Sequence, residues 1–113
     1  MTSGPVRLSR ATNGVHKFTA QFPDGPKVNF GRKGYSDFTI HKDRERMKRY
    51  LTRHGGSRAP GARGTRSRRE NWTRAGARTA GFWSRWLLWS EPSFQAALRR
   101  TQKVLGRKIV LSR

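Results

Sequence analysis

The chain has 113 residues, of which 33% are hydrophobic, and its 26 lysines and arginines outnumber 6 aspartates and glutamates to give a formal net charge of +20. This length suits at most one small domain. The absence of cysteine excludes disulfides and thiolate metal sites, and no run reaches the roughly 18 apolar residues that a membrane-spanning helix needs. Such an excess of cations repels itself in isolation, so it indicates an anionic partner.

The first 30 residues predict a three-stranded antiparallel β-meander. Residues 6–12 and 15–22 alternate between apolar and polar types and are joined by an Asn-Gly pair, which is a strong hairpin signal because both residues tolerate positive φ. A Pro-Asp-Gly-Pro turn then leads to a third strand at residues 27–30. A sheet of this size needs a cover for its apolar face.

Two glycines flank two cations at residues 31–34 (GRKG). We interpret this stretch as a basic turn, because a phosphate-binding loop carries a lysine and a hydroxyl residue directly after its second glycine. Residues 35–40 (YSDFTI) fit either a further short strand or an extended approach to a helix.

An amphipathic helix is expected at residues 43–54, with Asp43 as its N-cap. Met47, Tyr50, Leu51 and His54 recur at helical spacing and form one apolar stripe. The other faces are basic, which fits either a solvated surface or a contact with nucleic acid. The basic residues of this helix are Arg44, Arg46, Lys48, Arg49 and Arg53.

The composition changes abruptly at residues 55–70, which carry glycines and arginines and no large apolar side chain up to residue 69. Such a segment cannot bury enough surface to offset the entropy of ordering. It fits either a plain linker or a segment that orders on an anionic partner. The residues expected to contact an anionic partner, here and just beyond, are Arg58, Arg63, Arg66, Arg68, Arg69, Arg74 and Arg78.

The largest apolar cluster of the chain lies at residues 79–90 (TAGFWSRWLLWS). Thr79 can cap a helix there, and a helix that is apolar nearly all round is buried on several sides. We favour a core or protein-interface role for its rings over base stacking, since the chain has no other large source of apolar burial. The core and interface residues expected in this region are Trp72, Phe82, Trp83, Trp86, Leu87 and Trp89.

A last helix is expected at residues 91–105, with Ser90 as its N-cap and Gly106 as its stop. Residues 107–113 are β-prone and predict a strand that pairs either with the meander or with another molecule.

Catalysis and metal binding find no support in the sequence. His16, His41 and His54 fall on separate elements without ligand spacing, and no acid–base pair is apparent. We therefore expect no enzymatic activity, no metal and no cofactor.

Two stretches, residues 30–54 (FGRKGYSDFTIHKDRERMKRYLTRH) and 71–101 (NWTRAGARTAGFWSRWLLWSEPSFQAALRRT), resemble a family of small basic uncharacterised proteins of large nucleocytoplasmic DNA viruses of the mimivirus, phycodnavirus and iridovirus kind. The resemblance implies a virion location, with host cytoplasm during assembly, and a place beneath an icosahedral capsid or on packaged DNA. The arginine-rich stretch at residues 55–69 departs from the family pattern, in which a much shorter connection is expected.

We therefore expect a single small α+β domain with a β-meander (1–40), a basic helix (43–54), an Arg/Gly-rich loop (55–70), a Trp-rich helical part (71–105) and a β-prone tail (106–113). The first functional hypothesis is a minor structural protein of the virion that bridges larger capsid or assembly proteins within a large assembly. The second is a protein that binds DNA or RNA, either in the virion or in the manner of a ribosomal protein.

Overall fold

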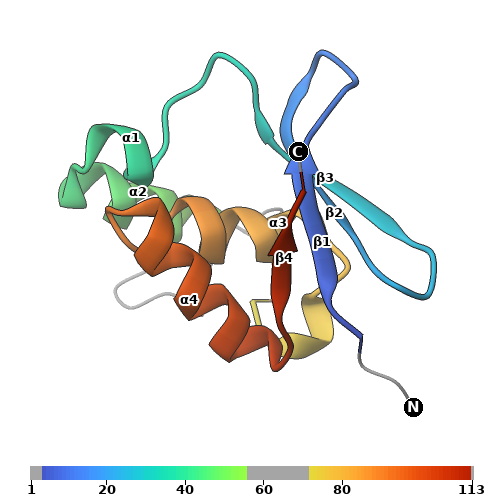
Figure 1. The fold of residues 1–113 in the computed structure, drawn as a ribbon. Helices are drawn as coiled ribbons and strands as arrows, with labels where there is room; N and C mark the ends of the chain where they lie inside the picture. The colour runs from blue at the N-terminus through green and yellow to red at the C-terminus, as the bar shows by residue number, and fades with distance from the viewer. Residues whose placement is uncertain (1–3, 56–71, 113) are drawn as a thin grey trace.

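The computed structural model describes residues 4–55 and 72–112 and has an α+β fold, in which helices cover one face of a four-stranded sheet (Figure 1). The strands are β1 (Val6–Arg10), β2 (His16–Gln21), β3 (Lys27–Arg32) and β4 (Ile109–Leu111). The helices are α1 (Phe38–His41), α2 (Arg44–Gly55), the 3₁₀ turn η3 (Arg74–Gly76), α3 (Ala80–Trp83), the π-helical turn η4 (Ser84–Leu88) and α4 (Phe94–Leu105).

The predicted meander is confirmed, and a fourth strand extends it. The sheet order is β3-β2-β1-β4, and β2 is antiparallel to both of its neighbours. β4 pairs with β1 in parallel, with Ile109 opposite Val6, so the first and last strands of the chain lie side by side (Figure 1). The C-terminal tail therefore pairs with the meander, which is the first of its two predicted partners.

The first hairpin has a longer loop than the Asn-Gly pair predicts. β1 ends at Arg10 and β2 begins at His16. The Asn13 side chain accepts the backbone N–H groups of Val15 and His16, each at 2.9 Å, and Gly14 takes φ 77°. The asparagine thus closes the turn through its side chain, a conformation that competes with a two-residue hairpin turn.

Trp83 is the centre of the core and is 0% exposed. Its ring stacks on Phe30 with centroids 5.6 Å apart and meets the edges of Phe22 and Phe82 at 6.2 and 5.8 Å. Its indole N–H donates to the carbonyl of Ala77 at 2.7 Å, so burial leaves the indole nitrogen satisfied. The Trp-rich segment therefore covers the apolar face of the meander.

The Trp-rich helix begins and ends through side-chain contacts. Thr79 caps α3, as predicted, by accepting the N–H of Phe82 at 3.4 Å. The helix then widens into the π-helical turn η4, where the Trp89 N–H donates to the carbonyl of Ser84 at 3.0 Å. The Ser90 hydroxyl donates to the Trp86 carbonyl at 2.6 Å, so Ser90 closes this helix instead of opening the next one.

The start of the last helix corrects the predicted boundary. α4 begins at Phe94, not at residue 91, because Ser93 is its N-cap and accepts the N–H of Ala96 at 3.2 Å. Its end is as predicted: Gly106 takes φ 78°, and its N–H donates to the Gln102 carbonyl. In the segment at residues 35–40 the extended approach is the correct alternative, because residue 38 already begins the short helix α1.

Candidate polyanion-binding surface

Helix α2 displays three arginines on one outward face. Asp43 caps the helix, as predicted, by accepting the N–H groups of Glu45 and Arg46 at 3.0 and 3.3 Å. Tyr50 turns inward and is 6% exposed, whereas Arg46, Arg49 and Arg53 are exposed. These three arginines follow at i, i+3 and i+7, so their side chains lie on one face of the helix. We call them the arginine face.

Within the described residues 4–55 and 72–112, no ion pair joins the arginine face to a carboxylate. The pKa of Asp43 is lowered chiefly by its hydrogen bond from the backbone N–H of Arg46 and, more weakly, by the charge of Arg49, so Asp43 offsets part of that charge. The acidic residue of α2, Glu45, lies 3.8 Å from Lys48. The other described ion pairs join Lys17 to Asp37, Arg78 to Asp24 and Arg100 to Glu91. Positions 46 and 53 are separated by about 10 Å along the helix axis at 1.5 Å per residue. That length corresponds to roughly three phosphates of a strand with 3.4 Å per charge.

A cleft with an aromatic lining adjoins the arginine face. A hollow of about 250 Å³ lies between the three arginines, the 35–36 loop and Trp89. Next to it is a larger hollow of about 550 Å³, which shares Tyr35, Ser36, Arg53 and Trp89. Tyr35 is 65% exposed, and the Arg32 guanidinium lies 5.7 Å from the centre of its ring. We call the two adjoining hollows the Tyr35 cleft.

The loop that carries Tyr35 is anchored by an ion pair between Asp37 and Lys17. Their charged atoms are 2.5 Å apart, and the side chains are 3% and 16% exposed. Asp37 also caps α1 by accepting the backbone N–H of Thr39 at 3.0 Å and its hydroxyl. On the other side of Tyr35, Gly34 takes φ 88°, a conformation that favours glycine. The sheet and α1 together thus fix the position of the Tyr35 loop.

A stack of rings fixes the opposite wall of the cleft. Tyr50 of α2 lies parallel to Trp89, with centroids 4.3 Å apart and planes 5° apart, and His54 stacks on Tyr50 at 4.2 Å. His41 contacts Trp89 with centroids 5.2 Å apart, and its Nδ1 accepts the N–H of Asp43 at 2.9 Å. These contacts join α2 to the end of the Trp-rich segment, so the wall is held by contacts within the chain itself.

His41 is held in its neutral form. Burial and, after it, the charge of Arg46 lower the pKa of His41, against the opposing charges of Asp43 and Asp37. An Nδ1 atom that accepts a hydrogen bond from a backbone N–H cannot also carry a proton. The hydrogen bond and the lowered pKa therefore both indicate a neutral His41 side chain.

The charged group of Arg85 makes its contacts within the molecule. It is half-buried, and its guanidinium lies 5.3 Å from the centre of the Trp72 ring and 4.4 Å from that of Trp86. It donates to the carbonyl of Trp89 at 2.9 Å. Burial first, and then the neighbouring charge of Arg100, lower the pKa of Arg85 to about 10, so the group stays charged at neutral pH.

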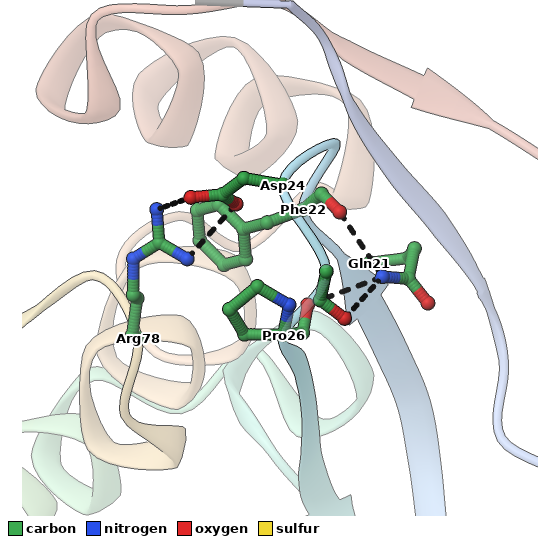
Figure 2. Close-up of polar contacts among 6 residues, drawn as sticks. Gln21, Phe22, Asp24, Pro26 and Arg78 are labelled. Carbon is green, nitrogen blue, oxygen red and sulfur yellow. Dashed lines mark hydrogen bonds and ion pairs between the residues drawn. The ribbon is translucent and has the colours of Figure 1, made fainter.

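Two of the arginines expected to contact an anionic partner make contacts within the chain. Arg78 donates two hydrogen bonds to the carboxylate of Asp24, at 3.1 and 2.9 Å, and its guanidinium covers the ring of Phe22 at 4.4 Å (Figure 2). This contact lowers the pKa of Asp24, chiefly through the side-chain hydrogen bond. Arg74 donates to the carbonyl of Val104 at 3.2 Å. The others lie outside the described residues: Arg58, Arg63, Arg66, Arg68 and Arg69.

The rings expected in the core or at an interface divide between full and partial burial. Phe82, Trp83 and Leu87 are 0% exposed. The half-buried members are Trp72, Trp86 and Trp89. The Trp86 indole N–H donates to the Trp72 carbonyl at 2.8 Å. Trp89, however, lines the Tyr35 cleft beside the arginines.

A second basic hollow lies on the face of the sheet away from the helices. It measures about 800 Å³, and Arg7, Lys27, Thr19 and Asn29 contribute to its lining. The Thr19 hydroxyl donates to the Asn29 side chain at 2.6 Å. The exposed ring of Tyr35 lines the Tyr35 cleft and does not contribute to this second hollow.

Residues 4–55 and 72–112 lack the features of two other kinds of site. No group of three or more histidines, aspartates and glutamates there could hold a metal ion. No helix in the same part of the chain is long and apolar enough to cross a membrane.

Part of the chain is similar to a known protein family. A model described as a family of unknown function (DUF5754) matches residues 6–54. The chain matches no curated protein and no solved structure. The matched stretch runs from the start of β1 into the last turn of α2, so it contains the meander, the Tyr35 loop and the arginine face. It ends before Trp89, which completes the cleft.

Sequence reasoning found the arginine face and missed the cleft. The arginines were predicted as the basic side of the 43–54 helix. Tyr35 lies in a segment whose conformation the sequence left open, and Trp89 lies 54 residues further along the chain. The only available signal for Tyr35 was its place in the long motif of residues 30–54, which set it apart from an ordinary loop residue.

Proposed function

We propose that the protein is a non-enzymatic structural protein of the virion of a large icosahedral DNA virus, and that it binds nucleic acid through the arginine face. The observation that best supports this proposal is the position of Arg46, Arg49 and Arg53. They are exposed on one helix face beside an exposed aromatic ring, and no described carboxylate pairs with them. The viral setting rests on the resemblance of residues 30–54 and 71–101 to proteins of such viruses.

Arginine is suited to this contact. Its planar guanidinium donates two parallel hydrogen bonds to a phosphate, and its weak hydration lowers the cost of close approach. Neutralising phosphates also releases condensed counterions, which makes the affinity fall steeply as salt rises. With a net charge of +20, most of the binding free energy is expected to be electrostatic and independent of sequence.

The placement of the tryptophans favours nucleic acid over a capsid-bridging role. Trp83 is 0% exposed, and the half-buried rings of Trp86 and Trp89 pack against Arg85 and Tyr50. They therefore offer a protein partner less surface than their number suggests. The exposed surface beside them is formed by arginines and Tyr35.

Fluorescence anisotropy with labelled DNA tests this proposal. Full-length protein freed of nucleic acid by nuclease and high salt is titrated at about 50 and about 200 mM salt. We expect micromolar or tighter binding at the lower salt and a loss of at least tenfold at the higher. Polyglutamate of similar length is the control competitor. The proposal fails if DNA does not bind, or if polyglutamate displaces it as well as unlabelled DNA does.

The second candidate is a minor capsid component that bridges larger capsid proteins. It is supported by β4, a strand at the sheet edge whose Val110 and Leu111 are 45% and 52% exposed. An exposed edge with apolar side chains can accept a strand from another protein. This role predicts a fixed copy number in purified particles after nuclease treatment. Absence of the protein from such particles would exclude it.

A further inference from the structure

We propose that the Tyr35 cleft is a binding site for an unpaired nucleotide, with the base stacked on Tyr35 and the adjoining phosphates on the arginine face, so that the protein prefers single-stranded nucleic acid to duplex. This inference rests on the proposed function and names the form of nucleic acid that the same surface takes.

The size and shape of the cleft fit such a ligand. The larger hollow, of about 550 Å³, lies within the range of about 300–1,000 Å³ typical of small-molecule sites. It adjoins the smaller hollow that the three arginines line, since both share Tyr35, Ser36, Arg53 and Trp89. A base in the larger hollow would therefore place its phosphates near the arginines.

The chemistry of the lining suits a planar ring joined to an anion. Tyr35 presents a ring that is 65% exposed, with the Arg32 guanidinium 5.7 Å from its centre. Every base has a flat face that can stack on such a ring, whatever the sequence. The carboxylate in the lining, Asp37, is bound by Lys17 and by Thr39, so it adds little repulsion.

The cleft is formed before the ligand binds. Tyr50 and Trp89 hold one wall by parallel stacking at 4.3 Å, and the pair between Lys17 and Asp37 anchors the loop on the other side. A preformed site avoids the entropy cost of ordering its side chains on binding.

Single-stranded and duplex nucleic acid differ in whether a base can enter the Tyr35 cleft. In a duplex the bases are paired and stacked inside, so only the phosphates reach the arginine face. In a single strand a base can turn outward and enter the recess. The same arginines thus bind both forms, while Tyr35 adds affinity for single strands alone.

A test measures the affinities for a single strand of about 15 nucleotides and for the matching duplex by anisotropy. We expect Tyr35→Ala to weaken single-strand binding about tenfold, within the range for loss of one base–aromatic stack, and duplex binding by less than about twofold. Tyr35→Phe keeps the ring and is expected to bind like the unchanged protein. Ile40→Ala removes a side chain that is also well exposed, at 61%, and is the matched control outside the cleft.

The outcomes separate the two proposals. If the protein binds nucleic acid and Tyr35→Ala leaves single-strand affinity unchanged, or weakens both forms equally, the nucleotide site is overturned and the proposed function stands. If the unchanged protein binds neither form, both are overturned. Circular dichroism of Tyr35→Ala confirms that folding is intact, as the exposure of this side chain predicts.

Discussion

Two regions of the molecule combine arginine with aromatic rings, and they use the combination in opposite ways. In the Trp-rich segment, Arg85 lies half-buried between the rings of Trp72 and Trp86. On α2 the arginines face outward, and the ring beside them, Tyr35, is exposed as well. The residue types are the same; what differs is their access to solvent and to a partner.

The comparison shows that the number of cations overstates the surface available to an anion. Arg85 is committed to two rings and a carbonyl, Arg78 to the carboxylate of Asp24, and Arg74 to a carbonyl of α4. On the arginine face no described ion pair engages the guanidinium groups, so their forks are left for a phosphate.

The largest effect is expected from the centre of the buried region. Trp83→Ala removes a fully buried ring that contacts Phe22, Phe30 and Phe82, so it should lower the free energy of unfolding by about 4 kcal/mol. Urea denaturation followed by circular dichroism measures this loss. Trp83→Phe, which keeps part of the ring volume, should lose clearly less. Equal losses in both variants would contradict the role of the ring in filling the core.

A somewhat smaller loss is expected from the anchor of the exposed region. Asp37→Ala leaves the Lys17 ammonium partly buried without its partner and removes the cap of α1, which should cost about 3 kcal/mol. The double variant Asp37→Ala with Lys17→Met should recover part of that loss, because it also removes the unpaired charge. Thermal unfolding compares them. An unchanged melting temperature in Asp37→Ala would show that the ion pair does not hold the Tyr35 loop.

Removal of one charge from each region contrasts the regions directly. Arg85→Met should lower the free energy of unfolding by about 1 kcal/mol, since two cation–ring contacts and a hydrogen bond are lost, and should leave DNA affinity unchanged. Arg49→Met should leave stability within about 0.5 kcal/mol and reduce the slope of log affinity against log salt by about 0.7 for a single strand. Both variants have the same net charge. If both variants change DNA binding equally, the position of the arginine does not matter, and the contrast between the two regions is contradicted.

The smallest effect is expected from pH. Because the folded pKa of His41 lies below its usual value near 6.5, the unfolded chain takes up more protons here, and stability falls as pH drops below about 6.5. His41→Asn keeps an acceptor for the Asp43 N–H and cannot titrate, so its stability should change less between about pH 7 and 5. This window lies above the pKa of Asp24 and Asp43, which are lowered from 3.8. If the stability of the unchanged protein and that of His41→Asn depend on pH in the same way, His41 is not the group responsible for the pH dependence.

The sequence predicted most of the fold, because local signals agree with it. The alternation of strands β1 to β3, the caps at Asp43 and Thr79 and the stop at Gly106 are confirmed, since each acts within a few residues. Ser93 and not Ser90 caps α4, since the Ser90 hydroxyl already donates to the carbonyl of Trp86.

The candidate site was harder to predict, because long-range contacts build it. Lys17 meets Asp37 across 20 residues of sequence. The stack of Tyr50 on Trp89 joins the basic helix to the Trp-rich segment. Neither periodicity nor composition carries such pairings. The direction of the arginine face could be predicted from the stripe opposite it, whereas the exposure of Tyr35 and the enclosure of Arg85 could not.

The central claim is that nucleic acid binds at one face and not to the charge as a whole. The direct test compares two triple variants of equal net charge: Arg46, Arg49 and Arg53 changed to glutamine, and the exposed Arg99, Lys103 and Lys108 changed to glutamine. The first should reduce the salt slope for a single strand by about 2, which corresponds to three lost phosphate contacts. The second should leave it within about 0.7, the share of a single contact. Equal losses in the two variants would contradict the account.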